Sequence, residues 1–86
     1  MKAFEYTITD PMGIHARPAG MLAKTAKAFP ATEITLSKGD SSAKATQMIR
    51  LMSLGIQAGD QITVSVQGGD EDAALNAVSQ LLRQYF

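Results

Sequence analysis

Apolar and polar residues alternate in three segments of the chain, and this period of two is typical of strands with one buried face. The three segments are residues 4–9, 32–38 and 62–67. A shorter and more polar segment, residues 41–45, follows a turn signal at Gly39. We expect it to form a hairpin with the strand before it and to lie at the edge of the sheet.

Between these segments, the spacing of apolar residues changes to that of an amphipathic helix. Over residues 16–29 the apolar side chains recur on one face, and Pro30 ends the pattern. A second helix is predicted at residues 48–54, where the following Gly55 suits a helix C-terminal cap. The last helix is predicted to begin after Asp70, a favourable N-terminal cap, and to run nearly to the end of the chain.

The predicted order is therefore strand, helix, strand, strand, helix, strand, helix. Because the strands are apolar on one face only, helices need to cover just one side of the sheet. We expect an α+β fold, a two-layer α/β sandwich with a mostly antiparallel sheet, built by a single domain over residues 1–86. The short second helix has more apolar residues than about two turns can easily bury.

Composition narrows the classes of function. The chain has no cysteine, which excludes disulfides, cysteine-based zinc sites and a thiol nucleophile. Its eight basic and eight acidic residues give a formal net charge of zero, whereas nucleic-acid-binding proteins usually carry a basic excess. No apolar segment approaches the roughly 20 residues that span a bilayer, and the beginning of the chain does not have the pattern of a signal peptide. We expect a cytoplasmic monomer that binds no nucleic acid and does not insert in a membrane.

The residues around His15 form the clearest candidate site. His15 precedes the first predicted helix, whose opening N–H groups, including those of Ala16 and Arg17, have no partner within the helix. These amides and the helix dipole favour an anion such as phosphate, and the Arg17 guanidinium adds donors that match phosphate oxygens. Pro18 is tolerated because a first-turn N–H is not needed. A neutral imidazole, with an ordinary pKa of about 6.5, is a competent nucleophile toward phosphorus.

The chain lacks the parts of an enzyme that binds its own phosphoryl donor. There is no P-loop motif (GxxxxGK followed by Ser or Thr) and no evident cluster of metal-binding carboxylates, so we expect no metal and no other cofactor. His15 would then take a phosphoryl group from one protein and pass it to another, as a carrier and not as an enzyme. A lone histidine at a helix start is more often a cap or a surface residue, but capping explains neither Arg17 nor Pro18.

These residues resemble the histidine-containing phosphocarrier (HPr) family of the bacterial sugar phosphotransferase system. The likeness covers the whole chain, and residues 13–19 and 51–56 are the motifs that carry it, together with the turn at Ala58. The resemblance implies an open-faced β-sandwich with four antiparallel strands and three helices on one side. It implies that enzyme I, charged by phosphoenolpyruvate, phosphorylates Nδ1 of His15, and that the group then passes to a sugar-specific IIA domain. Arg17 matches the family's phosphate-contacting arginine.

The same resemblance implies a partner-binding surface on the first two helices. Its residues are Gly20, Lys24 and Lys27 on the first helix, and Met48, Ile49, Arg50, Met52 and Ser53 on the second. An exposed apolar patch ringed by basic residues suits acidic partners, and methionine-rich surfaces adapt to several partners. We expect Leu51 and Leu54 to be buried, and Met48, Ile49 and Met52 to be at least partly exposed. Lys24 and Lys27 fit a plain solvated face equally well.

One position departs from the family pattern. In Gram-positive relatives, a serine at the start of the short helix is phosphorylated by a dedicated kinase, and Gln47 occupies that place here. Thr46 fills the position only if the alignment is shifted by one residue. Thr46 is therefore the candidate for a regulatory site, where an added phosphate would weaken docking to the apolar patch.

Two other functions are compatible with parts of the sequence. An HPr-like regulatory module would use the phosphorylation state of His15 to signal to a transcription factor or a metabolic enzyme. A small-molecule or metal-binding domain of this size is disfavoured, because the chain has neither a CxxC pair nor a glycine-rich loop of the expected form.

Overall fold

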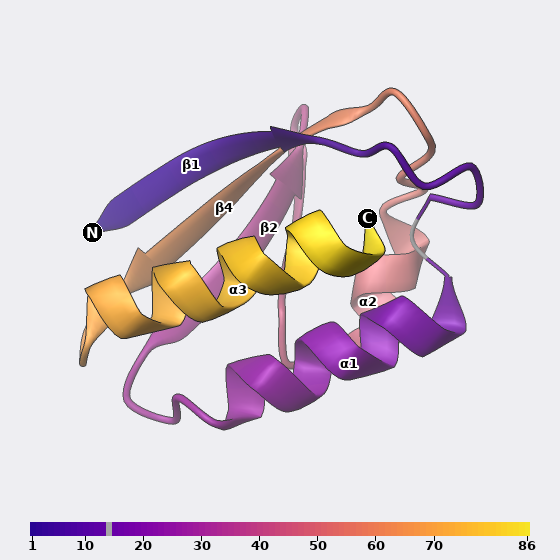
Figure 1. Cartoon of the computed structure of the whole chain (residues 1–86). Helices are drawn as coiled ribbons and strands as arrows, with labels where there is room; N and C mark the ends of the chain where they lie inside the picture. The colour runs from indigo at the N-terminus through magenta and orange to yellow at the C-terminus, as the bar shows by residue number, and fades with distance from the viewer. Residues whose placement is uncertain (14) are drawn as a thin grey trace.

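The computed structural model describes residues 1–13 and 15–86, and its elements follow the predicted order (Figure 1). In chain order they are β1 (Lys2–Thr7), α1 (Ala16–Lys27), β2 (Glu33–Lys38), β3 (Ser41–Lys44), α2 (Met48–Ser53), β4 (Gln61–Gln67) and α3 (Glu71–Tyr85). The strands form one antiparallel sheet in the order β1-β4-β2-β3, with the polar β3 at an edge. The helices cover one side of this sheet (Figure 1). The predicted open-faced α+β sandwich is confirmed.

The buried core lies between the sheet and the helices. Alternate side chains of β2 and β4 point into it, and the register places Leu36 beside Val64 and Ile34 beside Val66. The helices contribute fully buried side chains from their apolar faces: Leu22, Leu51, Val78 and Leu82. Each such side chain stabilises the fold by roughly 1.5–3 kcal/mol relative to an exposed one. Because α1 and α2 pack on the same core, their positions relative to each other are fixed.

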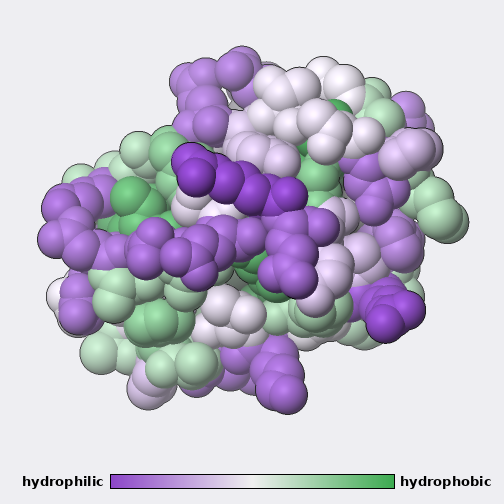
Figure 2. Space-filling view, viewed as in Figure 1, coloured by the Kyte–Doolittle hydropathy of each residue, from purple (hydrophilic) through white to green (hydrophobic). Residues whose placement is uncertain are grey.

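The solvent-facing side of α3 is mostly polar. In Figure 2, a band of hydrophilic atoms runs along α3, and apolar atoms lie on either side of it. This is the expected consequence of an amphipathic helix whose apolar face is buried. Asp70 caps α3 as predicted, because its Oδ1 accepts a hydrogen bond from the Ala73 N–H at 3.1 Å.

Element boundaries differ from the prediction by one or two residues. The first helix was expected to reach Phe29, but α1 ends at Lys27. The N–H groups of Ala28 and Phe29 donate to the carbonyls three residues back, both at 3.1 Å, so the chain tightens into a last narrow turn before Pro30.

The ends of the strands also shift by one or two residues: β1 and β4 begin earlier than expected, at Lys2 and Gln61. β1 ends at Thr7, and Ile8 instead exchanges hydrogen bonds with the loop before β4, donating to Asp60 at 2.9 Å and accepting from Gly59 at 2.8 Å. Thr32 lies outside β2, and its hydroxyl donates to the Gly68 carbonyl at 2.9 Å. The exchange at Ile8 anchors the start of the loop that leads to His15.

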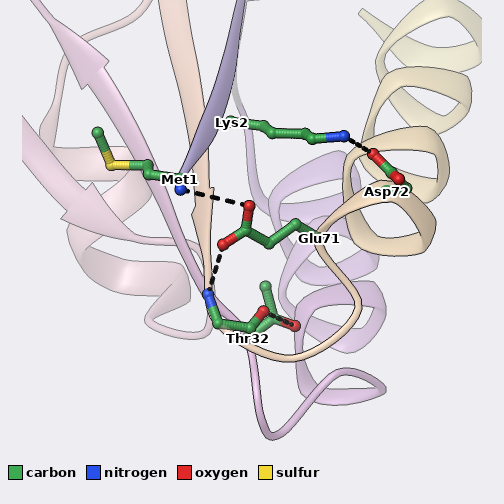
Figure 3. Close-up of polar contacts among 6 residues, drawn as sticks. Met1, Lys2, Thr32, Glu71 and Asp72 are labelled. Carbon is green, nitrogen blue, oxygen red and sulfur yellow. Dashed lines mark hydrogen bonds and ion pairs between the residues drawn. The ribbon is translucent and has the colours of Figure 1, made fainter.

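Polar contacts close the end of the sandwich where β1 begins (Figure 3). Glu71 joins two segments, because one carboxylate oxygen accepts from the Gly68 N–H at 2.9 Å and the other lies 3.4 Å from the Met1 amino group. Lys2 pairs with Asp72 beside it. The hydrogen bond from Gly68 is the main reason that the pKa of Glu71 is lowered. Figure 1 places this network at the end of the molecule opposite the start of α1.

Candidate functional site

His15 lies at the mouth of α1, as predicted. It is the N-terminal cap residue, with extended backbone angles, and its carbonyl accepts the Ala19 N–H at 3.0 Å. Its side chain is 34% exposed, so it is held by the protein and still reachable from solvent. In the part of the chain that the structure describes, no side chain caps this helix. The preceding residue of the motif, Ile14, lies outside the described residues.

The start of α1 has the exposed first-turn positions on which the predicted anion site depends. Ala16 and Arg17 occupy the first two helical positions, and both are exposed. Pro18, at the third position, is buried and has no N–H to donate. The α1 sequence has no acidic residue in its first turn, so no carboxylate from that turn opposes the positive end of the helix dipole. The N–H groups of Ala16 and Arg17 lie in the first turn, where an N–H has no partner within the helix.

Asp10 lies beside the imidazole. One oxygen of its carboxylate, Oδ2, is 4.0 Å from His15 Nε2, and the other, Oδ1, accepts from the Met12 N–H at 2.8 Å. The Asp10 carbonyl accepts from the Gly13 N–H at 2.9 Å. These two local bonds close a tight turn over residues 10–13, a role in which Asp is favoured. Asp10 was not among the site residues predicted from the sequence.

Gly13 fixes this turn against the loop that follows α2. Its φ is +63°, and a Cβ built on it would lie 2.3 Å from the carbonyl oxygen of Ile56. Only glycine fits both the backbone conformation and the close approach. The neighbouring loop is itself held in place, because Asp60 accepts from the Gln57 N–H at 2.8 Å and pairs with Lys38 at 2.8 Å. The hydrogen bond from Lys38, and then the hydrogen bond from the Gln57 N–H, hold the pKa of Asp60 below its usual value, and the charge of Lys38 adds a smaller effect.

The last residue of the structure also reaches this region. The Phe86 carbonyl oxygen accepts from the N–H groups of Thr9 and Asp10, the latter at 2.9 Å, and from the Thr9 hydroxyl at 2.9 Å. The backbone of Asp10 is therefore tied to the end of α3, while its side chain is tied to the turn. Neither this contact nor the Lys38–Asp60 pair could be predicted from a local pattern, because both join residues that are distant along the chain.

The structure brings most of the predicted partner-binding residues together between α1 and α2. A groove of about 790 Å³ has one wall from α1 and one from α2; its lining is Gly20, Ala23, Lys24, Lys27, Thr46, Gln47, Met48, Ile49 and Arg50. A Cβ at position 20 would lie 3.4 Å from Met48 Sδ, so a small residue at Gly20 lets the two helices approach closely.

The apolar residues of α2 and its C-terminal cap divide as predicted except at Leu54, which was expected to be buried and is only partly so. Leu51 is fully buried and Leu54 is partly buried against the core, whereas Met48, Ile49 and Met52 are 37%, 75% and 40% exposed. Met52 and Ser53 do not line the groove, and the Ser53 hydroxyl donates to the Ile49 carbonyl within its own helix at 2.9 Å. The exposed apolar side chains of α2 thus lie next to the basic side chains of the groove.

Residues 1–13 and 15–86 contain no group of three or more His, Cys, Asp or Glu side chains that could hold a metal ion. None of the helices within these ranges has the length and apolar character needed to cross a membrane.

Comparison with known proteins identifies the family. Residues 2–84 match the family model described as the PTS HPr component phosphorylation site. The chain is 39% identical to the phosphocarrier protein HPr of Mycoplasma pneumoniae, over 99% of this chain and 97% of that protein. It is also 43% identical, over 92% of its length, to 9% of a multiphosphoryl transfer protein from Xanthomonas campestris.

Solved structures agree with the sequence matches. A structure of the histidine-containing phosphocarrier protein of Mycoplasma superimposes with a TM-score of 0.92 at 34% identity, covering 96% of this chain and 93% of that one. HPr from Thermoanaerobacter tengcongensis superimposes with a TM-score of 0.90 at 32% identity, covering 98% and 93%. The chain therefore belongs to the HPr family of phosphocarriers of the phosphotransferase system, the PTS.

Proposed function

We propose that this chain carries a phosphoryl group on Nδ1 of His15, taking it from phosphorylated enzyme I and giving it to a sugar-specific IIA domain in phosphoenolpyruvate-dependent sugar uptake. The observation that carries the proposal is the position of His15, half-buried at the mouth of a helix whose first turn has no acidic residue. Membership of the HPr family supports the phosphoryl carrier role. The transfer partners are cytoplasmic in this proposal, and the protein works as a monomer without a cofactor.

In this proposal, the first-turn amides and Arg17 stabilise the transferred group. The phosphoryl group brings negative charge to a place where Ala16 and Arg17 have N–H groups outside the helical hydrogen-bond ladder. The Arg17 guanidinium is exposed and can turn toward the phosphate oxygens. The groove between α1 and α2 and the exposed apolar residues of α2 form the surface on which enzyme I and the IIA domain dock in turn.

The decisive experiment is phosphoryl transfer from labelled phosphoenolpyruvate through enzyme I. We expect the native chain to acquire an acid-labile, alkali-stable label, and the His15→Ala variant to acquire none. Because His15 is the chain's one histidine, equal labelling of both proteins would refute the proposal. Arg17→Ala is expected to keep the fold and slow transfer, since it removes an exposed side chain and no core contact. An unchanged transfer rate in Arg17→Ala would show that the guanidinium does not contact the phosphate.

We also propose Thr46 as a site of regulatory phosphorylation. It is exposed, it lines the groove, and it precedes Gln47, the N-terminal cap residue of α2. A phosphate on its hydroxyl would add negative charge between the basic side chains that the partners are proposed to approach. Mass spectrometry after incubation with ATP and an HPr kinase tests this. Absence of a phosphate on Thr46 would remove the site from consideration.

A further inference from the structure

The Asp10 carboxylate faces the imidazole of His15 with one oxygen and is anchored through the other. Oδ2 lies 4.0 Å from Nε2, with the Asp10 side chain 24% exposed. Oδ1 accepts from the Met12 N–H at 2.8 Å, and the Asp10 backbone is held by Gly13 and Phe86. The two oxygens therefore have separate roles, one in the turn and one toward the ring. A flexible surface carboxylate would have neither orientation fixed.

We propose that Asp10 is a positioning residue that keeps the proton of neutral His15 on Nε2, so that the lone pair of Nδ1 faces the incoming phosphoryl group. In a neutral imidazole, the hydrogen bond made by one nitrogen sets which nitrogen carries the proton. An ionised carboxylate only accepts hydrogen bonds, so it favours N–H at the nitrogen it faces. The 4.0 Å separation is longer than a hydrogen bond, and catalytic contacts of this kind often shorten only when the partner binds. This role rests on the proposed function of His15.

The proposed tautomer allows transfer without moving a proton. The Nδ1 lone pair forms the new N–P bond, and the bond between phosphorus and the phosphorylated donor protein breaks, with its electron pair leaving on the donor. The proton stays on Nε2, so the ring becomes cationic beside the Asp10 carboxylate, which offsets the charge. When the group passes onward, the N–P electron pair returns to Nδ1. The ring is then neutral again in the same tautomer and ready for another cycle.

Two substitutions at Asp10 separate this role from a purely structural one. Asp10→Asn keeps the turn, because its carbonyl oxygen can accept from the Met12 N–H. It then presents an NH₂ group to Nε2, which favours a lone pair there and a proton on Nδ1. Asp10→Ser also keeps the turn, because a serine hydroxyl can accept from the same N–H. Its side chain is too short to reach the ring. Asp10→Asn therefore reverses the preference for a proton on Nε2, whereas Asp10→Ser only removes it.

The measurements are the ¹⁵N chemical shifts of the imidazole at a pH where it is neutral, and the rate of phosphorylation by enzyme I. We expect proton occupancy on Nε2 to fall in the order native, Asp10→Ser, Asp10→Asn. The phosphorylation rate should fall in the same order, by roughly threefold for Ser and on the order of tenfold for Asn. Asp40→Asn, an exposed carboxylate in the turn between β2 and β3, is the matched control and should behave like the native chain.

The opposite order would overturn the proposal. If Asp10 serves only the turn, Asn is the better replacement, and Asp10→Asn will be as fast as the native chain, with an unchanged tautomer. Failure of the proposed function gives a different result, because the native chain itself would then take no label on His15. Backbone amide spectra confirm that each variant is folded before rates are compared.

Discussion

Gly13 shows how much a single residue can determine at this site. It has a positive φ and also lies against the Ile56 carbonyl. It joins the turn of Asp10 to the loop after α2, so the position of His15 two residues later depends on it. The glycine was part of the family motif in the sequence. The second reason for glycine at this position, its close approach to the Ile56 carbonyl, can be seen only in the folded chain.

We expect Gly13→Ala to destabilise the fold and to slow phosphorylation of His15. The new Cβ would lie 2.3 Å from the Ile56 oxygen, and a positive φ is unfavourable for alanine, so the free energy of unfolding should fall by roughly 2 kcal/mol or more. Gly39→Ala is the matched control, because Gly39 has a φ of +57° and no atom within 4 Å of its Cβ position. Denaturant unfolding of both variants separates the free-energy cost of the clash with Ile56 from the cost of a positive φ at alanine. Equal decreases in the free energy of unfolding would mean that the loop after α2 shifts at no cost to accommodate the new Cβ.

At the same scale, the sequence predicted a role for His15 and Arg17 but none for Asp10. His15 and Arg17 lie two residues apart in one short motif, so a shared chemistry can be proposed from their spacing alone. Asp10 acts through a turn whose geometry depends on Gly13 and on Phe86, a residue at the far end of the chain. Its orientation toward Nε2 follows from tertiary structure, which a local pattern does not contain.

At the scale of elements, α2 depends on its surroundings more than on its own sequence. It has six residues, which is too short to be stable alone, and only Leu51 of its side chains is buried. Beyond its end, Lys38 of β2 donates to the Gly55 carbonyl at 2.9 Å and pairs with Asp60 at 2.8 Å. These contacts join a strand to the loop that supports the turn of His15.

Because of the Lys38–Asp60 pair, we expect the free energy of unfolding to fall as the pH is lowered into the acid range. The folded-state pKa of Asp60 lies below its ordinary value of 3.8, so the unfolded chain binds the proton more tightly. The stabilisation is present above the unfolded pKa and is lost as pH falls through the folded one. We expect Asp60→Asn to be less stable than the native chain at neutral pH, and to lose less stability between about pH 5 and about pH 2.

Denaturant unfolding at several pH values checks this expectation. Asp40→Asn serves as the control, because Asp40 is exposed in the β2–β3 turn. Parallel pH profiles for the native chain and Asp60→Asn would show that the pair does not contribute to folding. The effect is expected to be modest, since Asp60 and Lys38 are both partly exposed to solvent.

The elements themselves were largely predictable, and their ends were less so. Alternation and helical spacing follow from burial of one face, so the order and type of all the elements could be inferred. The ends depend on particular hydrogen bonds. At the end of α1, the N–H groups of Ala28 and Phe29 donate to carbonyls three residues back, and the helix ends two residues earlier than predicted. At the start of β2, the Thr32 hydroxyl donates to the Gly68 carbonyl, and the strand begins one residue later than predicted.

Over the whole molecule, a net charge of zero conceals an uneven distribution. The sequences of α1 and α2 have four basic residues and no acidic one: Arg17, Lys24, Lys27 and Arg50. The start of α3 has acidic residues instead, Glu71 and Asp72. Such an arrangement can steer an acidic partner toward one side without a net attraction. Composition alone could not have predicted it, because the fold is what gathers the basic side chains.

We expect Lys24→Glu to slow association with enzyme I several-fold at low salt, and the effect to shrink as salt is added. Arg83→Glu changes the charge by the same amount on the side of α3 that faces β1, where Arg83 lies near Phe4 and Asn76. It should have a much smaller effect. Stopped-flow association rates at several ionic strengths test this. Equal slowing by both variants would indicate that net charge, and not the groove, governs encounter.

The methionines of this protein all lie outside the fully buried core. Met1, Met12, Met48 and Met52 are exposed, and Met21 is only partly buried. An oxidant would therefore reach the thioethers of Met48 and Met52, on the proposed docking surface, without first opening the fold. Conversion to sulfoxide makes this side chain polar, so oxidative damage would impair recognition by partners while the β-sandwich itself stayed intact.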